Sequence, residues 1–444
     1  MTQISVGLDN QAYIMPYLLG WLENIDYPKR QLRTIFYIAS KDVIAEDQDL
    51  NSTAVVMSAL FVSAFEGNVA NCEEIDDNYR NREVQKRIEI SESVLPMLVN
   101  IDSIDSSYLT FDADNIPYYN GSSDPLKVFT ESARRMDIKL WIDNVKNHGF
   151  YIDGSLEVEE KRRTIRYMLA DLIADGQRLP IPSHTVRPWT PDKQLWDVDK
   201  IYMINLKRRP ERRAKMEKIF NILGVNATYW EATDGQNLPL DYHYRVLPGY
   251  LDPFHKRPIK AGEIGCFLSH YRIWQDVANL GLRRVIVFED DLRFTKDGLE
   301  RIREVLEDLD ASKLDWDLIY LGRKKQTDQE EVWVPHHRHL STVGYSYWTL
   351  GYILSAEGAR RLLNAEPLRN LLPVDEYFPI MFNKHPNKEW SERFPVRNLR
   401  AFTLYPLTVF PQLYTHQEGY VSDTEDSIIV EKENTSEKML KLEL

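Results

Sequence analysis

The second half of the chain alternates between short apolar runs and longer segments in which apolar residues recur at helical spacing. Short apolar runs rich in β-branched residues are typical of strands that are buried on both faces of a sheet. Because strands that alternate with helices of this length form mostly parallel sheets covered on both sides, we predict an α/β fold. The predicted elements are, in chain order, strand 200–206, helix 210–223, strand 228–231, helix 263–279, strand 284–288, helix 299–309 and strand 316–321.

The first half of the chain carries a weaker pattern of the same kind. Strand 4–8, helix 13–25 and strand 34–39 predict an α/β opening without a glycine-rich phosphate loop, and 161–175 predicts a further helix. Four prolines within 179–196 predict a linker. The tail is polar and poor in aromatic residues, so we expect it to be disordered. The predicted division is a domain at 1–180, a linker at 181–197, a domain at 198–417 and the tail at 418–444.

Length, charge and cysteine content narrow the class of protein. A chain of 444 residues is long enough for two or three domains. Its net charge of −13 argues against general nucleic-acid binding, which needs a basic surface. The two cysteines, Cys72 and Cys266, cannot build a disulfide framework or a CxxC zinc site. Cys266 falls within the 263–279 helix pattern, where we expect a packed core thiol.

Two sets of signals point to different compartments. No run reaches the ~18–20 apolar residues of a membrane span, so we expect none. The start lacks the basic-then-apolar pattern of a secretory signal, which by itself places the chain in the cytosol. The last four residues, KLEL, instead resemble an endoplasmic-reticulum retrieval tail. Glycosylation sequons stand at Asn51, Asn120, Asn226 and Asn434.

The strongest chemical signal is an acidic triplet at the end of a predicted strand. The apolar run 285–288 stops at Glu289, Asp290 and Asp291. Side chains two residues apart on a strand point the same way, so Glu289 and Asp291 share a side. Carboxylates in this arrangement suit Mg²⁺ or Mn²⁺ carrying a diphosphate. The alternative is a solvated acidic turn.

Further polar residues fall at the ends of neighbouring predicted strands. Ligands of parallel α/β sheets bind at the carboxyl ends of the strands, where Asn205, Asp234 and Gly322-Arg323 lie beside the triplet. Asn205 is a candidate for a base or ribose contact, and Asp234 for either a ribose contact or a turn. Arg208 and Arg212, four apart on one predicted helical face, could hold a diphosphate. A solvated basic face is the alternative.

Two other positions are candidates for roles near the reacting groups. Asp375 and Glu376 follow an apolar run, and a partly buried carboxylate suits a base that takes the proton of an attacking hydroxyl. We place Asp375 first and Glu376 second as base. A helix-capping role for Asp375 is the alternative. For His270 we expect a hydrogen-bonded packing role first and substrate contact second.

Taken together, these motifs resemble glycosyltransferase family 25, and within it the procollagen (hydroxylysine) galactosyltransferases. The resemblance spans about half the chain, from Tyr202 to Glu425. The matching segments are YMINLKRRPERR, EATDG, LPGYLDPFHKRPIKAGEIGCFLSHYRIW, VIVFEDDLRF, LDWDLIYLGRKK, YSYWTLGYILSAEGARRLL, LPVDEYFPIMF and GYVSDTE.

This resemblance implies two tandem GT-A-like (Rossmann-like) glycosyltransferase domains and an enzyme of the endoplasmic-reticulum lumen. The implied reaction moves galactose from UDP-galactose onto hydroxylysine of collagen or collagen-like chains, with Mn²⁺ and with inversion. By position, 289–291 matches the family's metal motif, and Asn205, Arg208 and Arg212 match its donor-side motif. The sequence leaves a homo-oligomer open.

The chain also departs from the family pattern in its first domain. A block near 45–55 is missing, so we expect this domain to be incomplete. Asp112-Ala113-Asp114 imitates an acidic metal motif, with a turn as the alternative. The intact triplet and Asp375 favour an enzyme. The incomplete first domain favours a catalytically silent binding or adhesion protein. A third possibility is an enzyme of this class that uses another sugar or another acceptor.

Overall fold

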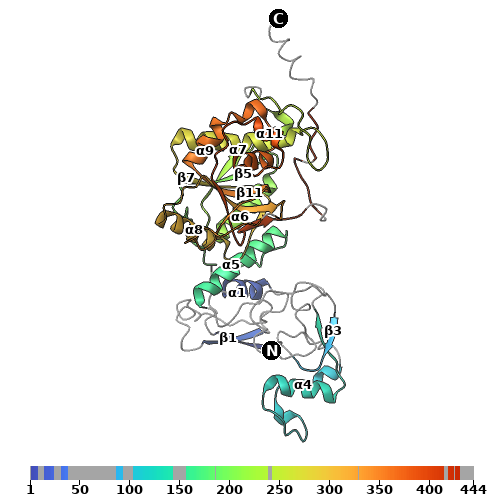
Figure 1. Ribbon diagram of the computed structural model, residues 1–444. Coiled ribbons are helices and arrows are strands. Elements are labelled where there is room, and N and C mark those ends of the chain that lie inside the picture. The colour runs from blue at the N-terminus through green and yellow to red at the C-terminus, as the bar shows by residue number, and fades with distance from the viewer. Residues whose placement is uncertain are drawn as a thin grey trace. The chain divides into compact units, whose positions relative to one another are not determined.

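A computed structural model of the protein describes most of the chain as two compact units (Figure 1). One unit comprises Met1–Met168 and Pro180–Trp189, and the other comprises Leu169–Leu179 and Thr190–Leu444. Among the described residues, no helix is long and apolar enough to cross a membrane. The described residues are 2–8, 15–24, 32–38, 87–93, 104–143, 157–185, 187–238, 243–328, 330–414, 419–424 and 426–430.

The N-terminal unit opens with the predicted strand, helix and strand. Strands β1 (Thr2–Leu8) and β2 (Leu32–Ile38) pair in parallel, and helix α1 (Met15–Asn24) connects them in sequence. The other elements of this unit are β3 (Arg87–Ile90), η4 (Ile104–Tyr108), η5 (Ala113–Asn115), α4 (Pro125–Arg135), β4 (Leu140–Asp143) and the first part of α5 (Val158–Ala174). Asp112 caps η5 by accepting a hydrogen bond from the Asp114 amide at 3.1 Å, which is the turn that we kept as the alternative to a metal motif.

The C-terminal unit is built on a seven-stranded sheet in the order β10-β12-β9-β11-β7-β5-β6. Strands β6, β5 and β7 are parallel neighbours, whereas β11 runs antiparallel to both β7 and β9. Strand β12 is parallel to β9, and β10 is antiparallel to β12, so five of the seven strands run in one direction and the α/β prediction is confirmed. The strands are β5 (Lys200–Asn205), β6 (Ala227–Glu231), β7 (Arg284–Phe288), β9 (Leu318–Lys325), β10 (Leu340–Thr342), β11 (Ser346–Ser355) and β12 (Ala401–Leu404). A separate pair is formed by β8 (Leu292–Phe294) and β13 (Val409–Pro411).

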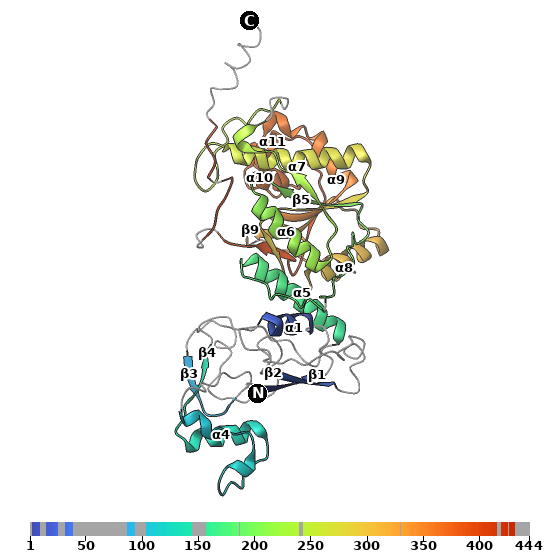
Figure 2. The ribbon, with the colours of Figure 1, turned by 180° about the vertical axis from the view of Figure 1, so that it is seen from behind.

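Helices cover both faces of this sheet, as two opposite views show (Figures 1 and 2). Helices α7, α9 and α10 lie on one face, where Trp274 of α7 and Tyr377 of α10 belong to one buried apolar cluster. Helices α6 and α8 lie on the other face, where Phe220 of α6 packs against Phe288 of β7. The helices are α6 (Pro210–Leu223), α7 (Ala261–Leu280), α8 (Gly298–Ala311), α9 (Ala356–Asn364), η7 (Pro367–Asn370), α10 (Val374–Met381) and α11 (Lys388–Glu392), with η6 (Gly235–Asn237) after β6.

The described part of the predicted tail is held against the C-terminal unit, where the sequence predicted disorder. The Ala261 amide donates to the Ile428 carbonyl at 2.8 Å, and the Val430 amide donates to the Ile259 carbonyl at 3.0 Å. Composition did not reveal this segment because backbone pairing does not depend on a high apolar content. We call residues 419–424 and 426–430 the C-terminal strap. The remainder of the predicted tail, 431–444 with KLEL, lies outside the described residues.

Candidate active site

Three neighbouring parallel strands bring the candidate residues to one edge of the sheet. Strand β5 ends at Asn205, and β7 ends directly before the acidic triplet 289–291. Strand β6 leads into Asp234, which caps η6. Because the carboxyl ends of parallel neighbours lie at the same edge, residues that are distant in sequence meet there. Asn205 Nδ2 donates a hydrogen bond to Asp290 Oδ2 at 2.6 Å.

Asp290 points inward and links β7 to the start of α6. Its side chain is buried, and Arg212 lies 3.4 Å from Oδ1 while Asn205 binds Oδ2. The Asn205 amide also donates to the Arg209 carbonyl at 3.0 Å, which fixes the turn before the helix. Burial raises the pKa of Asp290, and the charge of Arg212 opposes that rise. Since protein groups engage both of its oxygens, Asp290 is the least available carboxylate of the triplet.

Glu289 and Asp291 are more open to a ligand than Asp290. Glu289 Oε1 accepts a hydrogen bond from Thr349 at 2.6 Å and lies 3.3 Å from His270 Nε2. Burial acts to raise the pKa of Glu289, but the hydrogen bonds of His270 and Thr349 bring it below its ordinary value. Asp291 Oδ1 is buried and has no hydrogen-bond partner among the described residues. Burial, with the charges of Glu289 and Asp290, raises the pKa of Asp291 to about 7.

Asp375 adds a further carboxyl group whose environment is coupled to the triplet. It lies in the first turn of α10 and accepts a hydrogen bond from the backbone of Trp348. Trp348 has a left-handed backbone with φ of 71°, at a register shift of β11. Residues held in such conformations concentrate at functional sites. Burial, followed by the charge of Glu289, raises the pKa of Asp375 to about 8, and within the described part of the chain its Oδ1 has no hydrogen-bond partner.

Glu376, the adjacent residue, has the opposite environment. Its side chain is buried, with 2% of its surface exposed. Oε2 accepts a hydrogen bond from the Tyr345 hydroxyl at 3.0 Å and lies 2.7 Å from His385 Nε2, while Oε1 accepts one from the Tyr347 hydroxyl. Because both oxygens are engaged, the geometry favours a structural role for Glu376 and leaves Asp375 as the candidate base.

This edge of the sheet suits a hard divalent cation. Asp291 and Asp375 each have a buried oxygen without a hydrogen-bond partner, and the negative charge of Glu289 raises both of their pKa values. Buried like charges are costly unless they are paired or bind a metal. Carboxylate oxygens are the ligands that Mg²⁺ and Mn²⁺ prefer. Glu289 and Asp291 are therefore the residues that fit such an ion best.

Arg208 and Arg212 do not share a helical face, which corrects the sequence prediction. Helix α6 begins at Pro210, whose ring suits the first turn, so Arg208 lies in the preceding loop. Both arginines nevertheless reach Asp423 of the C-terminal strap. Its Oδ1 lies 2.6 Å from Arg208 Nη1, and its Oδ2 lies 3.8 Å from Arg212 Nη1. The strap therefore neutralises part of the basic segment.

A pocket of about 460 Å³ opens beside Arg208 and Asp234. Arg208 Nε donates to Asp234 Oδ2 at 2.9 Å, and the Gln236 amide donates to Asp234 Oδ1 at 3.0 Å. Asp234 thus forms the turn and also lines the pocket. The two predicted roles, a turn and a ribose contact, are therefore compatible. The cations Lys207, Arg208 and Arg272 form part of the pocket wall.

Several residues that shape this edge were not singled out from the sequence. They are Trp348, Thr349, Tyr352 and Asp423, which reach the edge from β11 and from the C-terminal strap. The segments YSYWTLGYILSAEGARRLL and GYVSDTE contain them, so the family resemblance was the available signal. His270 was expected to pack with hydrogen bonds, and it is fully buried against Tyr352 and Glu289.

Comparisons with known proteins agree with this architecture. Residues 198–378 match the profile of glycosyltransferase family 25 (LPS biosynthesis protein). The chain contains a glycosyltransferase family 25 domain. It is also 41% identical over 358 residues to a glycosyltransferase 25 family member of Anopheles gambiae, covering 77% of this chain and 60% of the relative. The resemblance identified from the sequence motifs is confirmed.

Two vertebrate proteins that are similar to this chain carry a more specific name. Procollagen galactosyltransferase 1-B of Xenopus laevis is 40% identical over 320 residues, which cover 70% of this chain and 52% of the relative. Procollagen galactosyltransferase 2 of Mus musculus is 39% identical over 328 residues, which cover 72% and 52%. The chain spans between about half and three fifths of the length of these curated relatives.

Proposed function

We propose that the protein transfers galactose from UDP-galactose to hydroxylysine of collagen or collagen-like chains, with Mn²⁺ and with inversion of the sugar carbon. The observation that carries the proposal is the grouping of Glu289, Asp291 and Asp375, in which unpartnered carboxyl oxygens face like charge. The printed names of the vertebrate relatives support the choice of sugar and acceptor.

Each residue at the sheet edge has a proposed role in holding the donor. Glu289 and Asp291 would bind the metal, which supplies positive charge against the charge that develops on the departing diphosphate. Asp290 holds the triplet in place through Asn205 and Arg212. We assign the pocket beside Arg208 and Asp234 to the nucleotide end of the donor. Most of the acceleration would come from positioning and from electrostatic stabilisation.

Asp375 is the proposed general base. It accepts the proton of the attacking hydroxyl while the new bond to the sugar carbon forms and the bond to UDP breaks. Attack from the face opposite UDP gives inversion. A base of this kind contributes about 10²–10⁴-fold to the rate. The partly buried carboxyl of Asp375 has one free oxygen for this task, whereas the oxygens of Glu376 are occupied.

The test measures UDP release from UDP-galactose with Mn²⁺ and a collagen peptide that contains hydroxylysine. We expect acceptor-dependent release by the wild type and none above background by the Asp291→Asn variant. The matched control is Asp114→Asn, which makes the same chemical change at the exposed acidic turn of the N-terminal unit and should leave release unchanged. If UDP release is lost in Asp114→Asn and not in Asp291→Asn, the metal site lies in the N-terminal unit.

The rival function is a catalytically silent binding or adhesion protein. The departure of the first domain from the family pattern near residues 45–55 is the observation that favours it. A well-folded wild type that neither binds UDP-galactose nor releases UDP would support this rival. Binding without release would instead point to another acceptor.

We further propose that the protein works in the lumen of the endoplasmic reticulum. The KLEL ending supports this location, and so do the exposed sequon residues Asn120 and Asn226, which leave room for glycans. The protein isolated from its native cells should migrate faster on a gel after removal of N-linked glycans. Unchanged migration of the protein after this treatment would contradict the lumenal location.

A further inference from the structure

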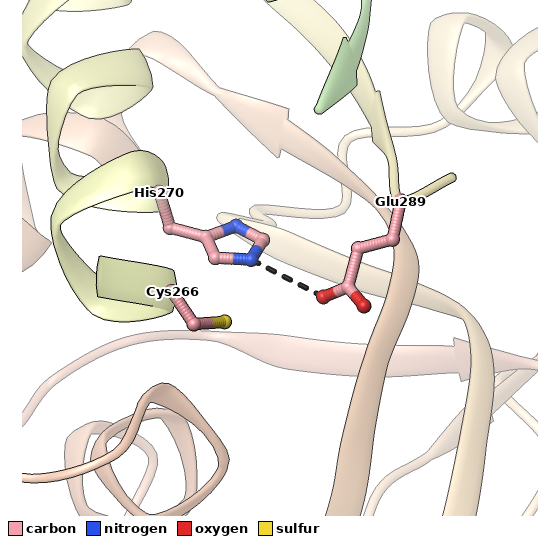
Figure 3. Close-up of side chains that lie close together, drawn as sticks. All are labelled: Cys266, His270 and Glu289. Carbon is pink, nitrogen blue, oxygen red and sulfur yellow. Dashed lines mark hydrogen bonds and ion pairs between the residues drawn. The ribbon is translucent and has the colours of Figure 1, made fainter. Parts of the chain in front are cut away.

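Cys266, His270 and Glu289 form a compact group beside the metal carboxylates. Cys266 and His270 lie one turn apart on α7, and Glu289 follows β7 on the facing side (Figure 3). One potential ligand atom of each lies within 4.8 Å of the others. Thiol, imidazole and carboxylate groups are also the ligands of zinc. The hydrogen bonds around His270 decide between a zinc-type site and another role.

Two successive contacts among three side chains determine which ring nitrogen of His270 carries a hydrogen. Trp274 Nε1 lies 3.2 Å from the Tyr352 hydroxyl oxygen, which lies 2.9 Å from His270 Nδ1. An indole nitrogen can only donate, so the Tyr352 oxygen accepts from Trp274 and its own hydrogen is free for Nδ1. All three side chains are fully buried, which makes an unsatisfied hydroxyl hydrogen costly. Nδ1 is therefore the acceptor.

The other ring nitrogen of His270 then carries a hydrogen. A neutral imidazole that accepts at Nδ1 donates at Nε2. Nε2 lies 3.3 Å from Glu289 Oε1, an acceptor that suits this N–H. With its lone pair used up, Nε2 cannot also bind a metal. The arrangement therefore fits a directed hydrogen-bond relay from Trp274 through Tyr352 and His270 to Glu289 better than it fits a zinc site.

The relay controls which oxygen of Glu289 is left for a ligand. Oε1 receives both His270 and the hydroxyl of Thr349, the latter at 2.6 Å. Within the described part of the chain, no hydrogen bond reaches Oε2. Two donors on one oxygen fix the rotation of the carboxylate and leave the lone pairs of the second oxygen for a ligand. Groups that orient a metal ligand in this way strengthen metal binding.

We propose that His270 is a positioning residue, which Tyr352 and Trp274 orient so that it holds the carboxylate of Glu289 with Oε2 presented to a divalent cation. The inference rests on the proposed metal site but not on the identity of the sugar or of the acceptor. Cys266 has no part in the coordination.

The test measures Mn²⁺ binding to the full chain by the loss of the free-ion electron paramagnetic resonance signal, with no sugar present. His270→Asn removes the donor at the Nε2 position, whereas the longer amide of His270→Gln can place a donor there. We expect the Mn²⁺ dissociation constant to rise about 10–100-fold in His270→Asn. His270→Gln should recover most of this loss. Tyr352→Phe should weaken binding as well, because it removes the hydrogen that fixes the imidazole.

Thermal melting of each variant separates this role from general damage to the fold. If His270 has a purely structural role, His270→Gln and His270→Asn should both lose thermal stability and Mn²⁺ affinity, and glutamine should rescue neither. This result would overturn the proposal. Equal Mn²⁺ affinity in wild type, His270→Asn and Tyr352→Phe would overturn it too. If His270→Asn does not fold, the comparison of Tyr352→Phe and His270→Gln with the wild type decides.

A cobalt titration tests the competing zinc-type site. Co²⁺ bound to a thiolate gives a charge-transfer band, which we expect to be absent. A band that is present in wild type and in Cys72→Ser but lost in Cys266→Ser would overturn the relay. Failure of the proposed function can be told apart from failure of the His270 proposal. If the wild type binds Mn²⁺ but never releases UDP, the transferase proposal fails and the His270 proposal still stands. Wild type that binds no Mn²⁺ would remove both.

Discussion

Asp375 and Glu376 are adjacent carboxyl groups with different consequences when they are changed. Glu376 accepts from two tyrosine hydroxyls and lies beside the buried His385, whereas Asp375 has one oxygen without a partner. Removal of one member of a buried pair costs roughly 3–5 kcal/mol. We therefore expect Glu376→Ala to lower the melting temperature strongly. Asp375→Asn should fold normally and lose about 10²–10⁴-fold in the rate of UDP release. Comparable melting temperatures for the two variants would contradict this assignment.

Asp375 should also make the stability of the metal-free protein depend on pH. Because burial raises the pKa of Asp375 to about 8, the folded state holds this proton more tightly than the unfolded chain does. Its contribution is therefore complete below the ordinary aspartate pKa of about 3.9 and is lost as the pH rises through about 8. Asp291, with a pKa raised to about 7, acts in the same direction.

Melting in the presence of a chelator between pH 6 and 9 checks this dependence. The wild type should lose stability across this window, and Asp375→Asn should lose less, because its amide does not titrate. Saturating Mn²⁺ should flatten the wild-type curve. Parallel curves for wild type and Asp375→Asn would show that Asp375 titrates below this window.

At single positions, the sequence singled out candidate residues but did not predict their contacts. The acidic triplet 289–291 and Asp375 could be chosen as candidates because carboxylates at the end of a buried run are unusual. The inward orientation of the Asp290 side chain could not be predicted, because its partners Asn205 and Arg212 lie on another strand and on a helix. The role of His270 depends in the same way on Tyr352, which lies 82 residues away in the sequence.

At the scale of elements, the predicted strands and helices of the C-terminal unit agree with the structure within a few residues. Their apolar periodicity follows directly from burial on one or both faces. The antiparallel strand β11 was not predicted, although it supplies Thr349 and the backbone of Trp348 to the site. A strand inserted between β7 and β9 leaves no signal of its direction in its own sequence.

The C-terminal strap gives a prediction about a whole element. A chain that ends after Tyr414 loses the backbone bonds to Ile259 and Ala261 and the pairing of Asp423 with Arg208. At about 0.5–1.5 kcal/mol for each hydrogen bond, we expect a loss of roughly 2–4 kcal/mol. A matched chain that ends after Val430 keeps all of these contacts and should melt like the wild type. If both shortened chains melt together, the strap does not stabilise the unit.

At the scale of the whole molecule, the boundary between the units falls within α5 and not only in the proline-rich linker. Residues Leu169–Leu179 belong to the C-terminal unit, whose Lys215 Nζ lies 3.4 Å from the Ala174 carbonyl. Arg293 pairs with Asp175 as well. The sequence placed the boundary at the prolines because helix 161–175 gave no sign of which unit its apolar residues contact.

This boundary predicts how the protein can be divided. A fragment of residues 158–444 retains all of α5 and should unfold in one cooperative transition with wild-type Mn²⁺ affinity. A fragment of residues 190–444 keeps the whole seven-stranded sheet but lacks the contacts of Lys215 and Arg293 with the end of α5. It should melt at a lower temperature and expose apolar surface on α6. Melting curves and dye binding of the two fragments check this expectation.

A fragment 190–444 as stable as 158–444 would place the boundary at the prolines. Loss of Mn²⁺ binding in both fragments would mean that the metal site needs the N-terminal unit.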